Sequence, residues 1–492
     1  MVRKLALVMG VAVGAVGCSS MQTQTAHFAN VTGHSGISTT EGRSAGWADF
    51  DRNGCVDLLV SQASGPALYR NNCDRTFTDV TRESGIDGPP GAVGIAWADY
   101  DADGNIDVYI ASAAGVNALF RNNGDGSFTN TAATAGVNDD RAATGASWAD
   151  YDGDGDLDLF VANRFYPKPD SDITDRLYRN NSDGTFTDVA PDLGLGVANL
   201  KTFMGGWFDY DGNGTQDLYL AVDFNNDRLF RNNGQGGFQD VSAAAGISGP
   251  AHGMAVAIGD LNGDGCQDVV VTNNTRGKSG DSEHGPSTYY QNNCNGTFTN
   301  MTTAWGIEDR ATVDWGVQLV DWDNDGDDDL AIVSGGMLKG GEKEVNALYE
   351  NRNGRLVNVT RELGAEVNGA AFGSAWADYD NDGDLDWLIV NSKKNSVLLE
   401  NRAASGKYLK VKLKGAGANR DAVGARVELT SGGRTQVKTI LAGKGYASSE
   451  ELLLQFGLDG QSEVDRLKVS WPGGGQTTLH GLKVNRTIVI NQ

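Results

Sequence analysis

Nine-residue clusters of aspartate recur seven times along the chain. The third cluster reads DYDGDGDLD, from Asp150 to Asp158, and all seven share the pattern D-x-[DN]-x-[DN]-G-x-x-D. Side-chain oxygens therefore stand at positions 1, 3, 5 and 9, around a glycine that permits a tight turn. Ca²⁺ requires closely spaced oxygen ligands of this kind, whereas unpaired carboxylates at this density would repel one another. The pattern predicts seven calcium-binding loops, in which the carbonyl of position 7 is a further ligand.

The predicted calcium ligands lie at the same four positions of every loop. In chain order they are Asp49, Asp51, Asn53 and Asp57; Asp99, Asp101, Asp103 and Asp107; Asp150, Asp152, Asp154 and Asp158; Asp209, Asp211, Asn213 and Asp217; Asp260, Asn262, Asp264 and Asp268; Asp321, Asp323, Asp325 and Asp329; and Asp378, Asp380, Asp382 and Asp386. An EF-hand would need a glutamate at position 12, but that position is apolar in all seven loops, which excludes a helix–loop–helix arrangement. Solvated turns are the remaining alternative, and seven recurrences of one spacing argue against it.

The number of carboxylates in each loop predicts the order of calcium affinity. Loops 3, 6 and 7, which begin at Asp150, Asp321 and Asp378, are richest in aspartate and should bind most tightly. Loops 1, 4 and 5 hold three carboxylates each and should bind most weakly. Extracellular modules of this kind bind calcium at roughly 10⁻⁴ to 10⁻³ M. We expect up to seven Ca²⁺ ions with a structural role, holding hairpins together, and no catalytic one.

The elements that position these loops also repeat. The loops begin 50 to 61 residues apart, and each is preceded by an apolar segment such as GIAWA and followed by runs such as LDLFVAN, LYRNN and TFTDVT. This organisation indicates four short strands per unit, separated by turns. The 67 glycines and the lack of an apolar stripe with helical period also favour strands. We predict an all-β protein in which residues 27–404 form a seven-bladed β-propeller.

The last repeat lacks the segment that should form its fourth strand. An unmatched copy of that segment, HFANVTGHSGI, occurs at residues 27–37. We therefore expect Phe28 to Thr32 to complete the seventh blade, so that the two ends of the propeller chain share one sheet and close the ring.

Four of the five cysteines occur in matched places. Cys55 and Cys266 both occupy position 7 of a loop, and Cys73 and Cys294 both follow the paired asparagines of the third strand. The five other repeats have a cysteine at neither place. Two positions that gain cysteine together within one repeat should touch, so we predict the disulfides Cys55–Cys73 and Cys266–Cys294. Metal binding by these thiols is disfavoured because the sequence has no CxxC spacing.

The repeated loops resemble the FG-GAP and VCBS repeats of integrin-like propellers. The resemblance covers residues 27–404, and it implies calcium bound in the hairpin between the first and second strands of each blade. The FG-GAP tripeptides themselves are absent, so the repeats are more similar to the VCBS branch.

The N-terminus is typical of an exported protein. Residues 1–17 combine a basic start with an apolar run that is too short to span a bilayer, which predicts a signal peptide. The ending AVGC resembles the bacterial lipobox, which implies lipid attachment at Cys18 and a tether over residues 18–26. We expect localisation at a bacterial membrane, on the periplasmic side of the outer membrane or at the cell surface. A secreted protein without an anchor is the alternative.

The repeat stops near residue 405, and the charge changes sign. The whole chain carries a net charge of −24, but residues 405–492 contain 13 Lys and Arg against 7 Asp and Glu. The alternating pattern predicts a small antiparallel β domain. The motifs NRDAVGARV (419–427), AGKGYASSE (442–450), FGL (456–458) and WPGG (471–474) resemble the ASPIC/UnbV domain. Its basic charge could dock on the aspartate loops or bind anionic glycans or headgroups, or Lys410, Lys412 and Lys414 could be ordinary surface lysines.

The predicted propeller has two unlike faces. The calcium loops share one end of the blades, which we call the Asp face. The three longest insertions, residues 164–175, 274–287 and 335–345, fall between strands two and three, on the opposite insertion face. Loops gathered on a rigid scaffold are a usual place for recognition. The short tether should turn the Asp face toward the membrane. Five tryptophans that precede the loops, Trp47, Trp97, Trp148, Trp207 and Trp376, should pack between blades, with a substrate-stacking ring as the alternative.

The sequence favours a binding function over catalysis. It contains no nucleophile elbow, zinc, P-loop or dinucleotide motif. We expect a calcium-stabilised, lipid-anchored binding or adhesion module whose partner is a glycan or surface protein, and no nucleic-acid partner. One alternative is an enzyme that acts on acidic polysaccharides through His252, His284 or Arg276. Another alternative is a structural partner in an envelope complex.

Overall fold

The chain folds almost entirely into β-sheets. The computed structural model describes residues 27–164, 173–197, 200–235, 237–247, 252–274, 285–308, 310–336, 343–403 and 406–492. Within these residues, seven four-stranded sheets form the blades of a propeller, and two further sheets lie C-terminal to them. The all-β prediction is confirmed.

Each blade consists of four antiparallel strands that follow one another in the sequence, except that the seventh takes its fourth strand from the N-terminus. The blades are β2 (Gly42–Ala48), β3 (Asp57–Gln62), β4 (Ala67–Asn71) and β5 (Phe77–Asp79); β6 (Ala92–Ala98), β7 (Asp107–Ser112), β8 (Ala118–Asn122) and β9 (Phe128–Asn130); β10 (Ala143–Ala149), β11 (Asp158–Asn163), β12 (Arg176–Asn180) and β13 (Phe186–Asp188); β14 (Thr202–Phe208), β15 (Asp217–Val222), β16 (Arg228–Asn232) and β17 (Phe238–Asp240); β18 (Gly253–Gly259), β19 (Asp268–Asn273), β20 (Thr288–Asn292) and β21 (Phe298–Asn300); β22 (Asp314–Val320), β23 (Asp329–Ser334), β24 (Ala347–Asn351) and β25 (Leu356–Asn358); and β26 (Ala371–Ala377), β27 (Asp386–Asn391), β28 (Val397–Asn401) and β1 (Phe28–Asn30).

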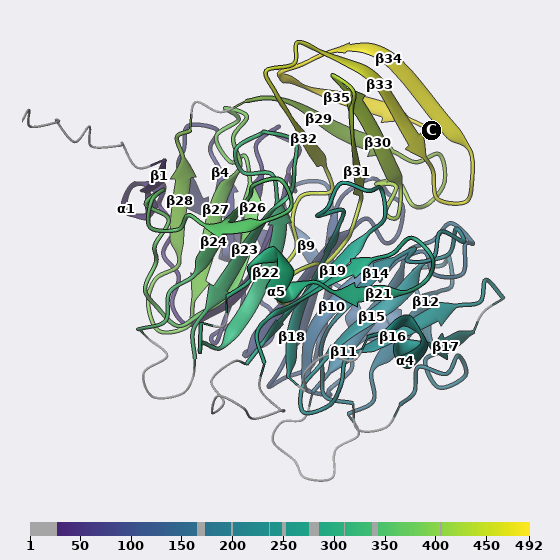
Figure 1. Cartoon of the computed structure of the whole chain (residues 1–492). Helices are drawn as coiled ribbons and strands as arrows, with labels where there is room; N and C mark the ends of the chain where they lie inside the picture. Colours follow the sequence, from purple (N-terminus) through teal and green to yellow (C-terminus); the bar gives the residue numbers. More distant parts are fainter. Residues whose placement is uncertain are drawn as a thin grey trace, which may run out of the picture.

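The seven sheets form a closed ring. The first strand of each blade contacts the first strand of the next, and β2 of blade 1 contacts both β6 and β26, the latter in blade 7. Figure 1 shows the blades side by side, with the C-terminal strands above them in yellow. Phe28 in β1 pairs with Asn401 in β28, which completes the last blade as predicted. The closing strand ends at Asn30, however, and the short helix α1 (Thr32–Ser35) follows, so Thr32 is helical and not part of the strand.

One-turn helices follow the fourth strands of several blades. They are α1, α2 (Thr81–Ser84), α3 (Ala132–Ala135), α4 (Ser242–Ala245) and α5 (Thr302–Trp305). Each ends at a glycine in the left-handed conformation, for example Gly85 with φ 75°. Glycine adopts this conformation without steric cost, so it ends the helical turn and sends the chain into the next blade.

Apolar side chains fill the space between neighbouring blades. The Trp148 ring stacks on Tyr100 of the preceding blade, with ring centroids 6.3 Å apart. Trp47, Trp97, Trp148, Trp207 and Trp376 are at most 4% exposed. Their packing between blades is confirmed, and the alternative of a substrate-stacking ring is wrong because a ligand cannot reach buried indoles.

Asparagines at the end of the third strands join the blades to one another. The side-chain amide of each donates a hydrogen bond to a backbone carbonyl in the loop of the preceding blade. These pairs are Asn71 with Tyr379, Asn122 with Phe50, Asn180 with Tyr100, Asn232 with Tyr151, Asn292 with Tyr210, Asn351 with Leu261 and Asn401 with Trp322. Asn71 of blade 1 reaches blade 7, so the set runs once around the ring.

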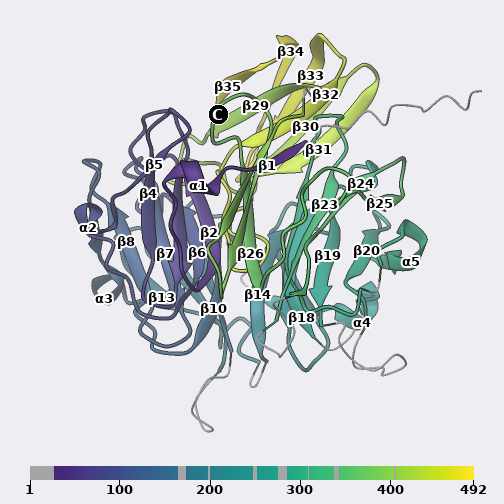
Figure 2. The ribbon, with the colours of Figure 1, turned by 90° about the vertical axis from the view of Figure 1, so that its left-hand side faces the viewer.

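The C-terminal residues form two sheets that lie across one end of the propeller (Figure 2). One contains β32 (Leu454–Asp459), β29 (Lys407–Lys414) and β35 (Arg486–Asn491), and the other β31 (Arg434–Thr439), β30 (Arg426–Ser431), β33 (Glu463–Ser470) and β34 (Gln476–Lys483). The expected antiparallel arrangement has one exception, because β29 and β35 pair in parallel. These strands lie 70 or more residues apart, so the local pattern gave no signal of their direction.

The predicted signal peptide, tether and lipidated Cys18 lie outside the described residues. Among the helices that the structure describes, none has the length and apolar character needed to cross a bilayer.

Candidate metal centres and the domain interface

The seven aspartate loops connect the first and second strands of the blades. In loops 1 to 4, the carboxylates at positions 1, 3 and 9 converge, with one oxygen of each within 4.8 Å of the others. These groups are Asp49, Asp51 and Asp57; Asp99, Asp101 and Asp107; Asp150, Asp152 and Asp158; and Asp209, Asp211 and Asp217. The spacing in the sequence thus brings predicted ligands together, because the turn folds position 3 back over the two strand ends.

The position 9 aspartate fixes both ends of its loop. Asp57 is buried; its Oδ1 accepts a hydrogen bond from the Asn71 amide at 2.7 Å, and its Oδ2 accepts one from the Phe50 amide at 3.1 Å. Each carboxylate oxygen has a further lone pair that could face a cation. Position 9 therefore has a structural role beside its predicted ligand role.

Backbone amides hold the turn around the other predicted ligands. In loop 1, Asp49 Oδ2 accepts a hydrogen bond from the Gly54 amide at 3.1 Å, and Asn53 Oδ1 accepts one from the Cys55 amide at 2.7 Å. The same two bonds recur in every loop. Position 5, predicted only as a ligand, thus also shapes the turn.

The loops contain buried carboxylate oxygens that have no hydrogen-bond partner within the described residues. They include Asp49 Oδ1, Asp99 Oδ1 and Asp321 Oδ1. Burial raises the pKa of Asp57 to about 8, and the neighbouring carboxylates of Asp51 and Asp49 add to the shift. A bound divalent cation would satisfy these oxygens and offset the repulsion. The acidic clusters therefore fit a hard cation held by oxygen ligands.

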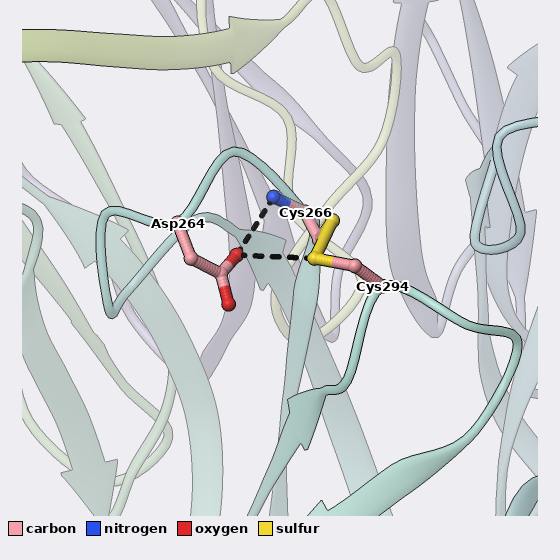
Figure 3. Close-up of side chains that lie close together, drawn as sticks. All are labelled: Asp264, Cys266 and Cys294. Carbon is pink, nitrogen blue, oxygen red and sulfur yellow. Dashed lines mark hydrogen bonds between the residues drawn. A yellow bond between two sulfur atoms is a disulfide. The ribbon is translucent and has the colours of Figure 1, made fainter.

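Both predicted disulfides form, one at loop 1 and the other at loop 5. The Cα atoms lie 5.7 Å apart in Cys55–Cys73 and in Cys266–Cys294, so both predictions are confirmed. In loop 5, Asp264 Oδ1 accepts a hydrogen bond from the Cys266 amide at 2.9 Å and lies 3.7 Å from Cys294 Sγ (Figure 3). Because both sulfurs are in the disulfide, they are not metal ligands. The bridge instead ties position 7 of the loop to the turn after the third strand.

The C-terminal domain docks on the Asp face. The motif at residues 419–427 donates hydrogen bonds to backbone carbonyls of three loops. The Arg420 side chain donates to Ala102 in loop 2 at 2.6 Å, the Asn419 amide to Gly155 in loop 3 at 2.8 Å, and the Arg426 side chain to Gly265 in loop 5 at 3.0 Å.

Ion pairs add to this docking. Lys410 pairs with Asp378 in loop 7, and Lys438 Nζ lies 2.8 Å from Asp328 in loop 6. Lys410 is buried, so the interpretation as an ordinary surface lysine is wrong for it, whereas Lys414 is exposed. Of the three interpretations of the basic charge, docking against the aspartate loops is the one that these contacts support.

The second motif enters the centre of the ring. The carbonyls of Ala442, Ala447 and Ser449 accept hydrogen bonds from the amides of Trp148, Ile95 and Trp47, at 2.8, 2.9 and 3.1 Å, and the Gly445 amide donates to Val256. These partners lie on the innermost strands of four blades, so the segment pairs with edges that face the axis. The Tyr446 ring packs against Phe203, Trp315 and Phe372. Residues 442–450, the central plug, thus fill the ring from the Asp face.

The remaining two motifs also lie at the domain interface. Gly457 of the FGL motif contacts loop 6, where its amide donates to Asp321 Oδ2 at 3.0 Å. The WPGG turn, residues 471–474, faces loops 3 to 5 across a cleft of about 750 Å³. All four motifs therefore contact the propeller or line its border with the C-terminal domain.

The insertion face holds the residues of the enzymatic alternative. His252 is buried, and its Nδ1 lies 2.9 Å from Asp223 Oδ1, while Asp223 also pairs with Arg164. His284 and Arg276 lie outside the described residues. Sequence reasoning missed Phe224, which is 58% exposed and has φ 62°, a conformation uncommon for a bulky residue. The His252 ring and the Lys201 ammonium both pack against it.

The sequence contains partial signals for two other features, the blade-to-blade hydrogen bonds and the central plug. The asparagine that ends the third strand recurs in all seven repeats, and this recurrence could have identified the blade-to-blade bonds. The glycines of AGKGYASSE, at positions 443 and 445, have positive φ, but the sequence gave no indication of where that segment would insert.

Two family models match the parts of this architecture. The family model described as FG-GAP-like repeat matches residues 49–110, 99–161, 209–271 and 321–389, and the model described as ASPIC and UnbV matches residues 415–492. Among solved structures, a lectin of Agrocybe aegerita is 21% identical, with a TM-score of 0.40, over 66% of this chain and 81% of its own. The BP39L lectin of Burkholderia pseudomallei is 10% identical, with a TM-score of 0.46, over 75% of this chain and 98% of its own.

The chain belongs to the proteins that combine an FG-GAP-repeat β-propeller with an ASPIC and UnbV domain. Among curated proteins it is similar to cartilage acidic protein 1: 26% identical to the protein of Mus musculus over 416 residues and 24% identical to that of Homo sapiens over 413. These alignments cover 68% of this chain but only 62% and 60% of the relatives, so the chain spans about three fifths of their length.

Proposed function

We propose that the protein is a calcium-stabilised binding module, anchored to the cell envelope by lipid at Cys18, that engages a glycan or a surface protein through its insertion face. The aspartate loops support the calcium part of this proposal. Their convergent carboxylates and unpartnered buried oxygens are the arrangement that a hard cation would stabilise.

The position of the C-terminal domain supports the proposal that the ligand binds at the insertion face. The domain covers the Asp face and its central plug fills the ring, so a large ligand meets the propeller from the opposite side. Two of the three large apolar side chains that are exposed among the described residues, Val116 and Phe224, lie on strand two to strand three connections at that side. An exposed aromatic ring beside a lysine suits stacking on a sugar ring together with a polar contact.

Phe224 is the residue that we expect to contact the ligand. Its left-handed backbone conformation and its exposure both have an energetic cost, and such features concentrate at functional sites. Lys201, whose Nζ lies 4.6 Å from the centre of the ring, would add a charged contact for an acidic ligand.

A glycan array with purified protein, in calcium and in EDTA, tests the proposal, and a pull-down from envelope extracts tests the protein alternative. We expect the Phe224→Ala variant to lose most of the binding, while Val489→Ala, which removes an exposed apolar side chain from the C-terminal domain, retains it. Binding that is equal in Phe224→Ala and the unaltered protein would contradict the assignment of the insertion face.

A further inference from the structure

Loop 6, residues Asp321–Asp329, is covered more completely than the other six loops. All seven loops lie within the described residues, and loop 6 is the one in which no residue is exposed. Asn324, at position 4, is fully buried. At the same position, loops 1, 3, 4, 5 and 7 carry exposed residues.

The cover over loop 6 is the C-terminal domain. The Gly457 amide donates to Asp321 Oδ2 at 3.0 Å, and the Asp459 amide donates to the Asn324 carbonyl at 2.8 Å. The Gln455 side chain donates to Asn324 Oδ1 at 2.9 Å. A Cβ on Gly457 would lie 2.2 Å from Asp321 Oδ2, so the strand approaches the loop as closely as a backbone without a side chain allows.

Beneath this cover, loop 6 holds carboxylate oxygens that have no partner. Asp321 Oδ1, Asp327 Oδ1 and Asp329 Oδ2 are buried and make no hydrogen bond within the described residues. No other loop has more than one such oxygen. The loop carries six aspartates, and the cations paired with them are Arg434, 3.2 Å from Asp327, and Lys438, 2.8 Å from Asp328. Two positive charges leave most of this negative charge uncompensated, although Asp321 and Asp329 are buried.

A cleft at the edge of loop 6 is lined by both aspartates and basic side chains. The cleft, of about 440 Å³, reaches Gly326, Asp327 and Asp328, and its other wall contains Arg434 and Lys438. None of the four predicted side-chain ligands of loop 6 lines this cleft, and the ion pairs of Arg434 with Asp327 and of Lys438 with Asp328 join the loop to the C-terminal domain across it.

From this geometry we infer that loop 6 holds one divalent cation enclosed between the propeller and the C-terminal domain, which exchanges with solvent much more slowly than the ions of the exposed loops. The inference rests on the proposed calcium function. The domain interface would thus distinguish loop 6 from the other six loops, because release of the ion from loop 6 requires the C-terminal domain to open.

The test is the rate at which calcium leaves the full-length protein. Protein loaded with radioactive calcium is mixed with excess EDTA, separated by rapid desalting at increasing times, and counted. We expect a fast phase from the exposed loops and a slow phase of one ion per chain, slower by about tenfold or more because it waits for local opening of the interface.

Two sets of variants locate the slow ion. Asp323→Asn changes position 3 of loop 6 to the residue that loop 5 has there, Asn262, so folding should tolerate it. It should speed the slow phase by about tenfold because one ligand charge is lost, whereas Asp211→Asn, the same position in loop 4, should leave it unchanged. Gln455→Ala and Arg434→Ala, which remove contacts over loop 6, should speed the slow phase. Arg420→Ala, which removes a contact to loop 2, should not.

The outcomes separate this inference from the proposed function. Protein that holds no calcium would overturn both. Calcium that leaves in a single phase, or a slow phase whose rate is unchanged in Asp323→Asn, would overturn the inference and leave the calcium function standing.

Discussion

The amide of Gly457 donates a hydrogen bond to Oδ2 of Asp321, with 3.0 Å between nitrogen and oxygen. This bond joins the FGL motif of the C-terminal domain to the first ligand position of a propeller loop. The same carboxylate oxygen accepts a bond from Gly326 within the loop, so one aspartate holds both the turn and the domain above it.

Replacing Gly457 by alanine should loosen the domain interface. The new Cβ would lie 2.2 Å from Asp321 Oδ2 and 2.4 Å from the Asn324 carbonyl carbon, so the strand must move away from loop 6. We expect a loss of about 1–3 kcal/mol in the free energy of unfolding, measured with urea. Gly460→Ala is the control, because nothing lies within 4 Å of its Cβ position. Equal stability of the two variants would contradict the close approach.

Replacing Asn122 by alanine should weaken the contact between blades 1 and 2. Its side-chain amide donates to the Phe50 and Ile106 carbonyls at 2.9 and 3.2 Å, and both carbonyls would lose this partner. The expected cost is about 1–3 kcal/mol in the free energy of unfolding. Asn123→Ala provides the control, since this neighbouring side chain is exposed and bonds only to Ser127 and Thr129 of the adjacent turn. A larger effect at Asn123 would refute the inter-blade role.

Within loop 3, calcium binding should depend on Asp152 and not on Asp156. Asp152 belongs to the converging group at position 3, whereas the Asp156 side chain accepts a bond from Ser182 outside it. Asp152→Asn should lower the affinity of this loop by about tenfold, because it removes one ligand charge, and Asp156→Asn should leave it nearly unchanged. Isothermal titration measures the affinities. Chelation with EDTA should lower the melting temperature of all three proteins, and an unchanged melting temperature would argue against a structural metal.

Asp227 should make stability fall as pH rises. Burial raises the pKa of its carboxyl to about 7, above the 3.8 of an exposed aspartate. Folding therefore favours the protonated form, and this contribution is lost as pH rises through 7. Asp227→Asn removes this carboxyl. The difference in the free energy of unfolding between the variant and the unaltered protein should therefore shift by about 2 kcal/mol in favour of the variant as the pH rises from 5.5 to 8.5.

The residue of blade 2 that is equivalent to Asp227 is an asparagine, Asn117, so asparagine should fit at position 227. Asn117 Oδ1 accepts the Ser112 amide as Asp227 Oδ1 accepts the Val222 amide in blade 4. Asp192→Asn, at an exposed aspartate, is the control for the loss of one carboxylate from the surface. Measurements in excess calcium keep the loops constant. A pH dependence that is the same in Asp227→Asn and the unaltered protein would refute the assignment.

The repeated parts of the structure could be predicted from the sequence. The spacing of the loops defined the blades, the unmatched copy at residues 27–37 defined the closing strand, and the paired gain of Cys55 and Cys73 defined a disulfide. In each case the sequence contains several copies of one unit. A comparison between the copies distinguishes residues that recur in every blade from residues that occur in only one or two.

The parts that occur once could not be predicted in this way. Loop 6 and loop 7 are almost equally rich in aspartate, yet only the fold shows that the C-terminal domain buries Asn324 and leaves Asn381 exposed. The central plug likewise depends on strands that lie hundreds of residues earlier in the chain. Docking of one domain on another follows from surface shape, which local residue patterns do not encode.

The pairing of β1 with β28 also sets the order in which the protein can assemble. Phe28 finds its partner only after Asn401 has been synthesised, so β1 precedes the other strands of the propeller in the sequence but is the last of them to be paired. Until then the edges of β28 and β1 are open to other chains, and contacts between such distant residues form slowly. A ribosome that stops before residue 401 therefore releases an unclosed ring with an adhesive edge, and aggregation of nascent fragments is the cost of joining the two ends in one sheet.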